Sequence, residues 1–125
     1  MSIGATWIIK AELEEGATLS PALTERLIGS LNRLKAWQAM LHVCQIVDDL
    51  QLDADQAGRM TDWAKSLAGH SRPFLRAWSV HVRVALGRRF EDYQHEVDVA
   101  LAAAERDLAA SVRARARQLK KARVS

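Results

Sequence analysis

The chain has 125 residues, of which 49% are hydrophobic and 26% are charged, and its formal net charge is +3. This length predicts a single domain over residues 1–125, with enough chain to bury roughly two thirds of its unfolded surface. The one cysteine, Cys44, excludes an intrachain disulfide and a cysteine-rich zinc site. Without a long apolar run or the features of a signal peptide, the sequence predicts a cytoplasmic protein that makes no contact with membranes.

Charge is distributed unevenly along the chain. Residues 1–62 hold five basic and nine acidic residues, a balance of −4, whereas residues 63–125 hold thirteen and six, a balance of +7. Such a skew favours an anionic partner. A solvated, basic C-terminal helix explains the same skew, so both interpretations stay open.

The first predicted helix covers residues 6–15, where the helical period places Trp7, Ile8 and Ala11 on one side. This apolar side either caps the stack of helices or offers a dimer surface. Gly16 is expected to end this helix. The pair Ser20-Pro21 then predicts the start of a second helix, because serine caps free amides and proline suits the first helical turn.

The rest of the chain also follows the helical period, and no segment alternates as a strand does. Asp53 and Gln56 have the spacing of a capping box, and Pro73 marks a later helix start. The predicted helices cover residues 33–49, 54–68, 73–87, 91–106 and 109–123.

A short phrase occurs three times in the sequence, at residues 34–37, 75–78 and 112–115. Its alanines are 41 and then 37 residues apart, a period that indicates stacked helical repeats. After an N-terminal capping segment, 1–18, the predicted repeats are 20–50, 53–88 and 91–123, each a pair of helices.

Aligning these repeats gives columns of equivalent residues. The apolar columns are expected to bury the faces that each pair leaves uncovered. They are Leu23, Met60 and Val97; Leu27, Ala64 and Leu101; Leu34, Leu75 and Val112; Leu41, Val82 and Leu119; and the small residues Cys44, Ala85 and Ala122. Trp37 and Trp78 also align and are expected inward, whereas the last repeat has Arg115 there, as suits a terminal repeat that faces water.

The segments 110–116 and 73–78 resemble the opening of the second helix in HEAT repeats, where a valine-arginine pair and an alanine often follow a proline. The resemblance covers about 100 residues, from Ser20 onward. It implies an all-α, right-handed α-solenoid of about three antiparallel helix pairs plus the N-terminal helix, about seven helices in all. It also implies a scaffold whose second helices line a concave surface, and an arginine that pairs with an aspartate of a neighbouring turn.

Two polar columns are the candidate binding residues. Seven residues separate the columns, about two helical turns, so they are expected on one stripe of each second helix. Together with two flanking arginines they would form a basic strip across the concave surface. The strip consists of Lys35, His42, Arg72, Arg76, Arg83, Arg113, Arg117 and Lys120. The alternative is a solvated face with structural ion pairs, in which case Arg76→Glu with Arg113→Glu would disturb folding.

Nothing in the sequence predicts catalysis, a cofactor or a metal site. His42 and Cys44 point in different directions on a helix, and the acidic turn around Asp48 and Asp53 lacks the pattern of a calcium loop. We therefore expect a non-enzymatic scaffold that binds a protein or peptide, with an acidic one among the candidates, and that is a monomer or weak dimer. The alternative function is nonspecific binding of a nucleic-acid backbone by the basic strip.

Overall fold

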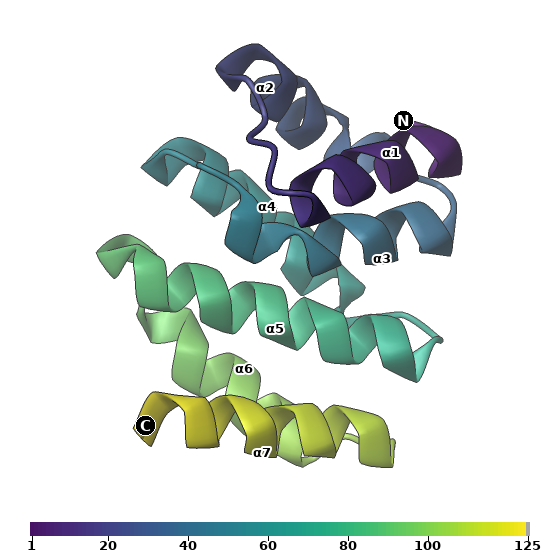
Figure 1. Cartoon of the computed structure of the whole chain (residues 1–125). Coiled ribbons are helices and arrows are strands. Elements are labelled where there is room, and N and C mark those ends of the chain that lie inside the picture. Colours follow the sequence, from purple (N-terminus) through teal and green to yellow (C-terminus); the bar gives the residue numbers. More distant parts are fainter. Residues whose placement is uncertain (125) are drawn as a thin grey trace.

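The computed structural model describes the backbone of residues 1–124 and the side chains as far as Ala122. All regular structure in this range is helical, which confirms the predicted all-α class with about seven helices. The α-helices are α1 (Ile3–Glu14), α2 (Pro21–Ser30), α3 (Trp37–Gln45), α4 (Ala54–Ser66), α5 (Pro73–Arg89), α6 (His95–Glu105) and α7 (Ala110–Val124) (Figure 1). Four 3-10 turns link them: η1 (Leu31–Arg33), η2 (Val47–Asp49), η3 (Leu67–Gly69) and η4 (Glu91–Tyr93).

Local sequence signals determine several helix ends. Gly16 has a φ of 94°, and its amide and that of Ala17 bond back to Leu13 and Glu12, which closes α1 with a Schellman motif. The Ser20 hydroxyl accepts a hydrogen bond from the Leu23 amide at the start of α2. The capping box predicted for residues 53–56 is present at the start of α4.

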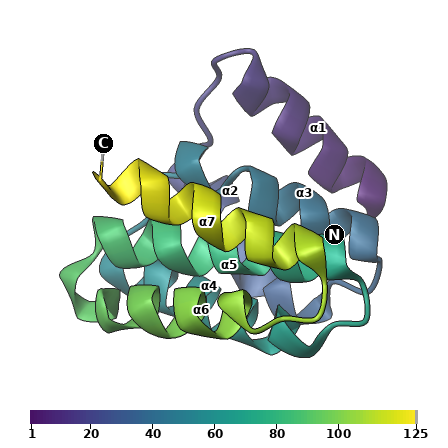
Figure 2. The same ribbon diagram turned by 90° about the horizontal axis from the view of Figure 1, so that it is seen from below.

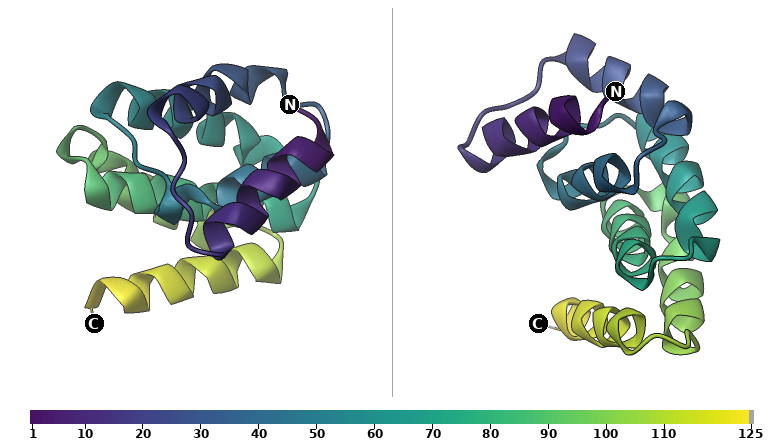
Figure 3. Two further views of the ribbon diagram at one scale, coloured as in Figure 1. Left: turned by 45° about the horizontal axis from the view of Figure 1, so that its top comes forward. Right: turned by 90° about the vertical axis from the view of Figure 1, so that its right-hand side faces the viewer.

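The helices lie in two rows. α1, α3, α5 and α7 follow one another side by side, and α2, α4 and α6 lie behind them (Figures 1 and 2). The rows bend, with α1, α3, α5 and α7 on the inside of the bend (Figure 3, right). We call this the inner row, and its surface toward the inside of the bend the inner face. Central helix α5 contacts four others, α3, α4, α6 and α7.

The buried side chains form two clusters that meet at α5. Leu75, Val82 and Leu86 of α5 belong to the cluster with α1–α4, while Val80 and Val84 belong to the cluster with α6 and α7. Most of the predicted apolar columns are buried in these clusters. The exceptions are Leu23, Leu41 and Ala85, which are half-buried, and Ala122, which is exposed. None of the described helices is both long and apolar enough to cross a bilayer.

The apolar side expected for α1 does not cap the rest of the fold. Trp7 and Ile8 are 59% and 54% exposed, and the buried residues of α1 are Thr6, Ile9 and Leu13. Thr6 Oγ1 lies 2.9 Å from Nδ1 of His42 in α3, so a polar contact shared by the two helices orients α1. Because apolar residues occupy both sides of α1, the helical period alone did not distinguish the packed side from the exposed one.

Candidate functional site

Helix α5 keeps one stripe of its surface open. Between Phe74 and Arg88, the residues of α5 that are not buried are spaced three or four apart, with Arg76 as the exception. This spacing places them on one side of the helix. They are Phe74, Trp78, His81, Ala85 and Arg88. This stripe contacts α7 through Trp78 and the η2 turn that follows α3 through His81, so it lies on the inner face.

Two arginines stack on two tryptophans along this face. The Arg72 guanidinium lies 4.0 Å from the ring centroid of Trp37, and that of Arg115 lies 4.5 Å from the ring centroid of Trp78. In each pair the tryptophan belongs to one helix of the inner row, and the arginine lies in the next helix of that row or directly before it. Stacking of this kind contributes about 0.5–1 kcal/mol at exposed positions and holds the guanidinium in a defined place.

A histidine continues the row. The His81 ring meets Trp78 edge-on with centroids 5.1 Å apart, and its Nε2 lies 2.9 Å from Oδ2 of Asp48. The hydrogen bond from His81 holds the pKa of the Asp48 carboxyl below its usual range, and attraction to His81 and Arg89 acts in the same direction. We call Trp37, Arg72, Trp78, His81 and Arg115 the inner-face cluster.

The predicted strip does not run along this face. Arg76 is two residues from Trp78, and Arg83 is two residues from His81. Two residues correspond to a rotation of roughly 200° around a helix, so both arginines lie on nearly the opposite side of α5 from the stripe. Arg76 donates from Nε and Nη2 to the two oxygens of Asp107, at 3.0 and 2.9 Å. This bidentate pair lowers the pKa of Asp107 and raises that of Arg76.

Arg83 is buried between α5 and α6 in a three-membered ion network. Its Nη2 lies 3.1 Å from Oε2 of Glu96, and Nζ of Lys65 lies 2.7 Å from the other oxygen. Burial alone would raise the pKa of Glu96, but the hydrogen bonds from Lys65 and Arg83 outweigh it and hold that pKa below the usual value. Arg83 therefore stabilises the helix packing and is closed to a ligand.

The remaining predicted residues are dispersed. Lys35 is exposed but precedes α3, because the chain passes through η1 and an extended stretch before the helix begins at Trp37. His42 contacts α1, and burial followed by repulsion from Lys10 lowers its pKa. Lys120 forms an ion pair with Glu105, and Arg117 is exposed on α7. Of the eight predicted residues, the inner-face cluster contains only Arg72.

One contact repeats between units. Arg76 donates to the carbonyl of His70 at 2.8 Å, and Arg113 donates to the carbonyl of Asp107 at 2.7 Å, in each case six residues upstream. The side chains of His70 and Asp107 each accept from the amide two residues on, so His70 takes the position of the aspartate in the second unit. Asp107 thus binds two arginines, Arg76 through its carboxylate and Arg113 through its backbone carbonyl.

Family models, curated proteins and solved structures were compared with this chain, and none of them matches it.

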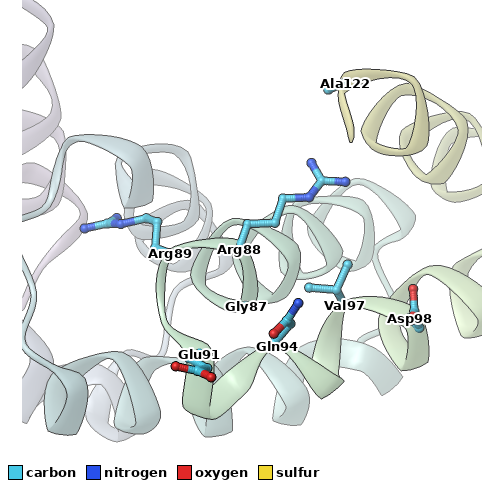
Figure 4. A pocket seen from close by; sticks show the side chains of 8 residues that line it. All are labelled: Gly87, Arg88, Arg89, Glu91, Gln94, Val97, Asp98 and Ala122. Atoms are coloured by element: carbon cyan, nitrogen blue, oxygen red, sulfur yellow. The ribbon is translucent and has the colours of Figure 1, made fainter. Parts of the chain in front are cut away.

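An open hollow of about 560 Å³ lies where α5 ends against α6 and α7 (Figure 4). Arg88 extends from it toward α7, where it donates to the Leu119 carbonyl at 2.7 Å. Arg89 extends away and donates to the carbonyls of Val47 and Leu50. Both arginines therefore tie helix ends together, and acidic Glu91 shares the hollow, so it does not concentrate charge of one sign.

The described residues contain no group of three or more His, Cys, Asp and Glu side chains that is placed to hold a metal ion. Burial of Cys44 raises the pKa of its thiol far above the usual value. In the acidic turn, Asp48 pairs with His81, Asp53 caps α4 and Asp55 lies 3.6 Å from Arg59. These acidic residues are thus engaged by protein groups.

The inner-face residues Trp78, His81 and Arg115 were not predicted as binding residues. The alignment had already placed Trp37, Trp78 and Arg115 in one column, and that column was the available signal. The alignment predicts core tryptophans and a polar residue in the last repeat, whereas both tryptophans are half-buried and covered by arginine.

Proposed function

We propose that this protein is a non-enzymatic binding module that uses its inner face to bind an acidic segment of a partner protein. We also propose that its two rows of helices form a short right-handed α-solenoid of the HEAT type. The sequence resemblance and the contact shared by Arg76 and Arg113 with their own turns support this second proposal.

The proposed function rests on the surroundings of the Arg72 and Arg115 guanidinium groups. Among the described residues, neither guanidinium has a carboxylate partner, whereas Arg76 and Arg83 are both engaged by acids. Stacking covers one face of each guanidinium and leaves its N–H groups to bind a carboxylate. Two oriented, unneutralised arginines on the inside of a bend favour a negatively charged ligand.

Anisotropy of a labelled, glutamate-rich peptide tests this function at 50 and 200 mM salt. We expect saturable binding that weakens with salt, and loss of affinity in Arg72→Ala and Arg115→Ala. Arg26→Ala is the matched control, because Arg26 is an exposed arginine on α2 in the other row. Absence of binding at 50 mM salt, or an equal loss in the control, would contradict the proposal.

The alternative is binding of a nucleic-acid backbone, favoured by the basic surface of α7, where Arg117 and Lys121 are exposed. A labelled DNA duplex titrated under the same conditions distinguishes the two functions. Tighter binding of the duplex than of the peptide, with a steep salt dependence, would replace the first proposal by this one.

A further inference from the structure

Helix α1 begins the inner row with an apolar side that no other helix covers. It packs against α3, and its buried residues are Thr6, Ile9 and Leu13. A residue two positions from one of these is turned by roughly 200° and so lies on the side away from α3. We call this surface the α1 side, and it consists of Gly4, Trp7, Ile8 and Ala11. Trp7 and Ile8 are 59% and 54% exposed.

Helix α7 forms the other end of the inner row (Figure 1). It packs against α5 and α6, and its buried residues are Val112, Ala116 and Leu119. The same rotation places the residues two positions from these on the side away from the row. We call this surface the α7 side, and it consists of Ala110, Ala114, Arg117 and Lys121. It is therefore small and apolar near the start of α7 and basic toward its end.

The charges at the two ends of the row are opposite. Glu12 and Glu15 are exposed where α1 ends, while Arg117 and Lys121 are exposed toward the end of α7. Among the described residues, none of these four side chains has an ion-pair partner. Each end of the row thus combines apolar surface with unneutralised charge, and the sign of the charge at one end complements that at the other.

The directions of the helices place these features together. In Figure 1, α1, α3, α5 and α7 all start on the right and end on the left. When α7 of one copy lies beside α1 of the next copy in this same direction, their apolar halves meet and their charged halves meet. Trp7 and Ile8 then pack on the alanines of the α7 side, whose small side chains allow a close approach. The glutamates of α1 meet the two basic residues.

The area of the two sides limits the strength of this contact. With only two large apolar residues, the α1 side offers roughly 200–300 Å² of apolar surface. Stable interfaces bury about 800 Å² on each partner. We therefore expect association with a dissociation constant on the order of 100 µM, so the protein is a monomer at low micromolar concentration.

We propose that the covering partner of the α1 side is the α7 side of a second copy of this chain. The contact is head-to-tail, so it continues the inner row from one copy into the next. Each pair of copies keeps one free α1 side and one free α7 side, so association does not stop at two copies.

Sedimentation of the full-length protein between about 10 and 500 µM tests the association itself. We expect the average mass to rise above the 13.9 kDa of one chain with concentration at 50 mM salt, and less at 200 mM salt. A mass that stays at 13.9 kDa throughout this range would overturn the proposal.

Two single substitutions test which surfaces meet. Trp7→Ser removes the aromatic residue of the α1 side, and Arg117→Glu reverses a charge of the α7 side. We expect each to weaken association about tenfold or more, the loss typical of an interface anchor. Phe74→Ser and Lys35→Glu are the matched controls, because Phe74 is 54% exposed on central α5 and Lys35 is exposed before α3. These two should associate as the unchanged protein does.

An equimolar mixture of Trp7→Ser and Arg117→Glu gives the decisive result. The first variant keeps an intact α7 side and the second an intact α1 side, so the mixture should associate again. Its mass should level off near 27.8 kDa, twice the 13.9 kDa of one chain, because the remaining sides are both altered. A mixture that stays monomeric would overturn the head-to-tail contact.

Two further outcomes would also contradict the proposal. Loss of association in Trp7→Ser but not in Arg117→Glu would indicate a two-fold contact between two α1 sides. An equal loss in the control variants would show that association does not depend on these surfaces. Circular dichroism of each variant confirms that the helical content is retained.

Discussion

Arg76 and Asp107 form two parallel hydrogen bonds that join α5 to the turn before α7, with Nε–Oδ2 and Nη2–Oδ1 distances of 3.0 and 2.9 Å. Asp107 also accepts from the Ala109 amide, so the same carboxylate positions the start of α7. Both side chains are only 18% exposed. An arginine that the sequence places among ligand-binding residues is therefore part of the connection between α5 and the start of α7.

Replacing Asp107 is expected to destabilise the protein. Asp107→Ala removes two charge-assisted bonds and leaves a largely covered guanidinium without its carboxylate partner, so we expect the free energy of unfolding to fall by about 1–3 kcal/mol. Urea denaturation followed by circular dichroism measures it. Glu105→Ala is the control, since Glu105 is 40% exposed and pairs with Lys120 on the surface. A loss no larger in Asp107→Ala than in this control would contradict the structural role.

Stability is also expected to depend on His42. Burial and repulsion from Lys10 lower its pKa in the folded protein, so the unfolded chain takes up the proton more readily. Neutral His42 therefore favours the folded state at pH values above the ordinary histidine pKa of about 6.5. This stabilisation is lost as the pH falls through the lower pKa that His42 has in the folded protein. We expect a urea midpoint that decreases between about pH 7.5 and 5.5, and a weaker decrease in His42→Gln.

The comparison for this pH effect is His95→Gln, because the His95 side chain is 69% exposed. Its midpoint should follow the pH dependence of the unchanged protein. If His42→Gln follows that dependence equally well, the contact between α1 and α3 does not respond to protonation of His42.

The sequence predicted the helix ends that depend on local contacts. Ser20, Gly16 and the Asp53–Gln56 box specify helix ends through contacts within a few residues, and each was found as expected. It did not predict which side of α5 stays open. The alignment identifies equivalent residues but does not show which side of the helix faces solvent. Arg76 and Trp78 both lie in aligned columns, so the alignment does not distinguish them. The sides on which the two side chains lie are determined by the packing of α6 and α7 against α5. That packing exists only in the assembled fold.

The exposed position of Trp7 on α1 has a measurable consequence. Trp7 is 59% exposed whereas Trp63 of α4 is only 5% exposed. We expect Trp7→Ala to change the free energy of unfolding by less than about 0.5 kcal/mol, the ordinary range for surface substitutions. Trp63→Ala should cost about 3–5 kcal/mol, as is usual for a buried aromatic residue. Urea denaturation of both variants compares them.

Acrylamide quenching gives an independent readout in the folded state. Trp7→Phe should remove the most readily quenched part of the fluorescence, because acrylamide reaches exposed rings first. An unchanged quenching curve for Trp7→Phe would instead indicate that α1 packs with Trp7 covered.

Gly87 is required by the close approach of α5 to α6. A Cβ at this position would lie 2.6 Å from Cγ2 of Val97 and 2.8 Å from the carbonyl oxygen of Tyr93. The Tyr93 backbone cannot move as a flexible side chain does, so Gly87→Ala is expected to destabilise the protein by about 1–3 kcal/mol. Gly29→Ala is the matched control in α2, where the nearest atom to a new Cβ is Nη2 of Arg59 at 3.8 Å. That substitution should stabilise the protein by up to about 1 kcal/mol through helix propensity, so thermal melts of the two variants should shift in opposite directions.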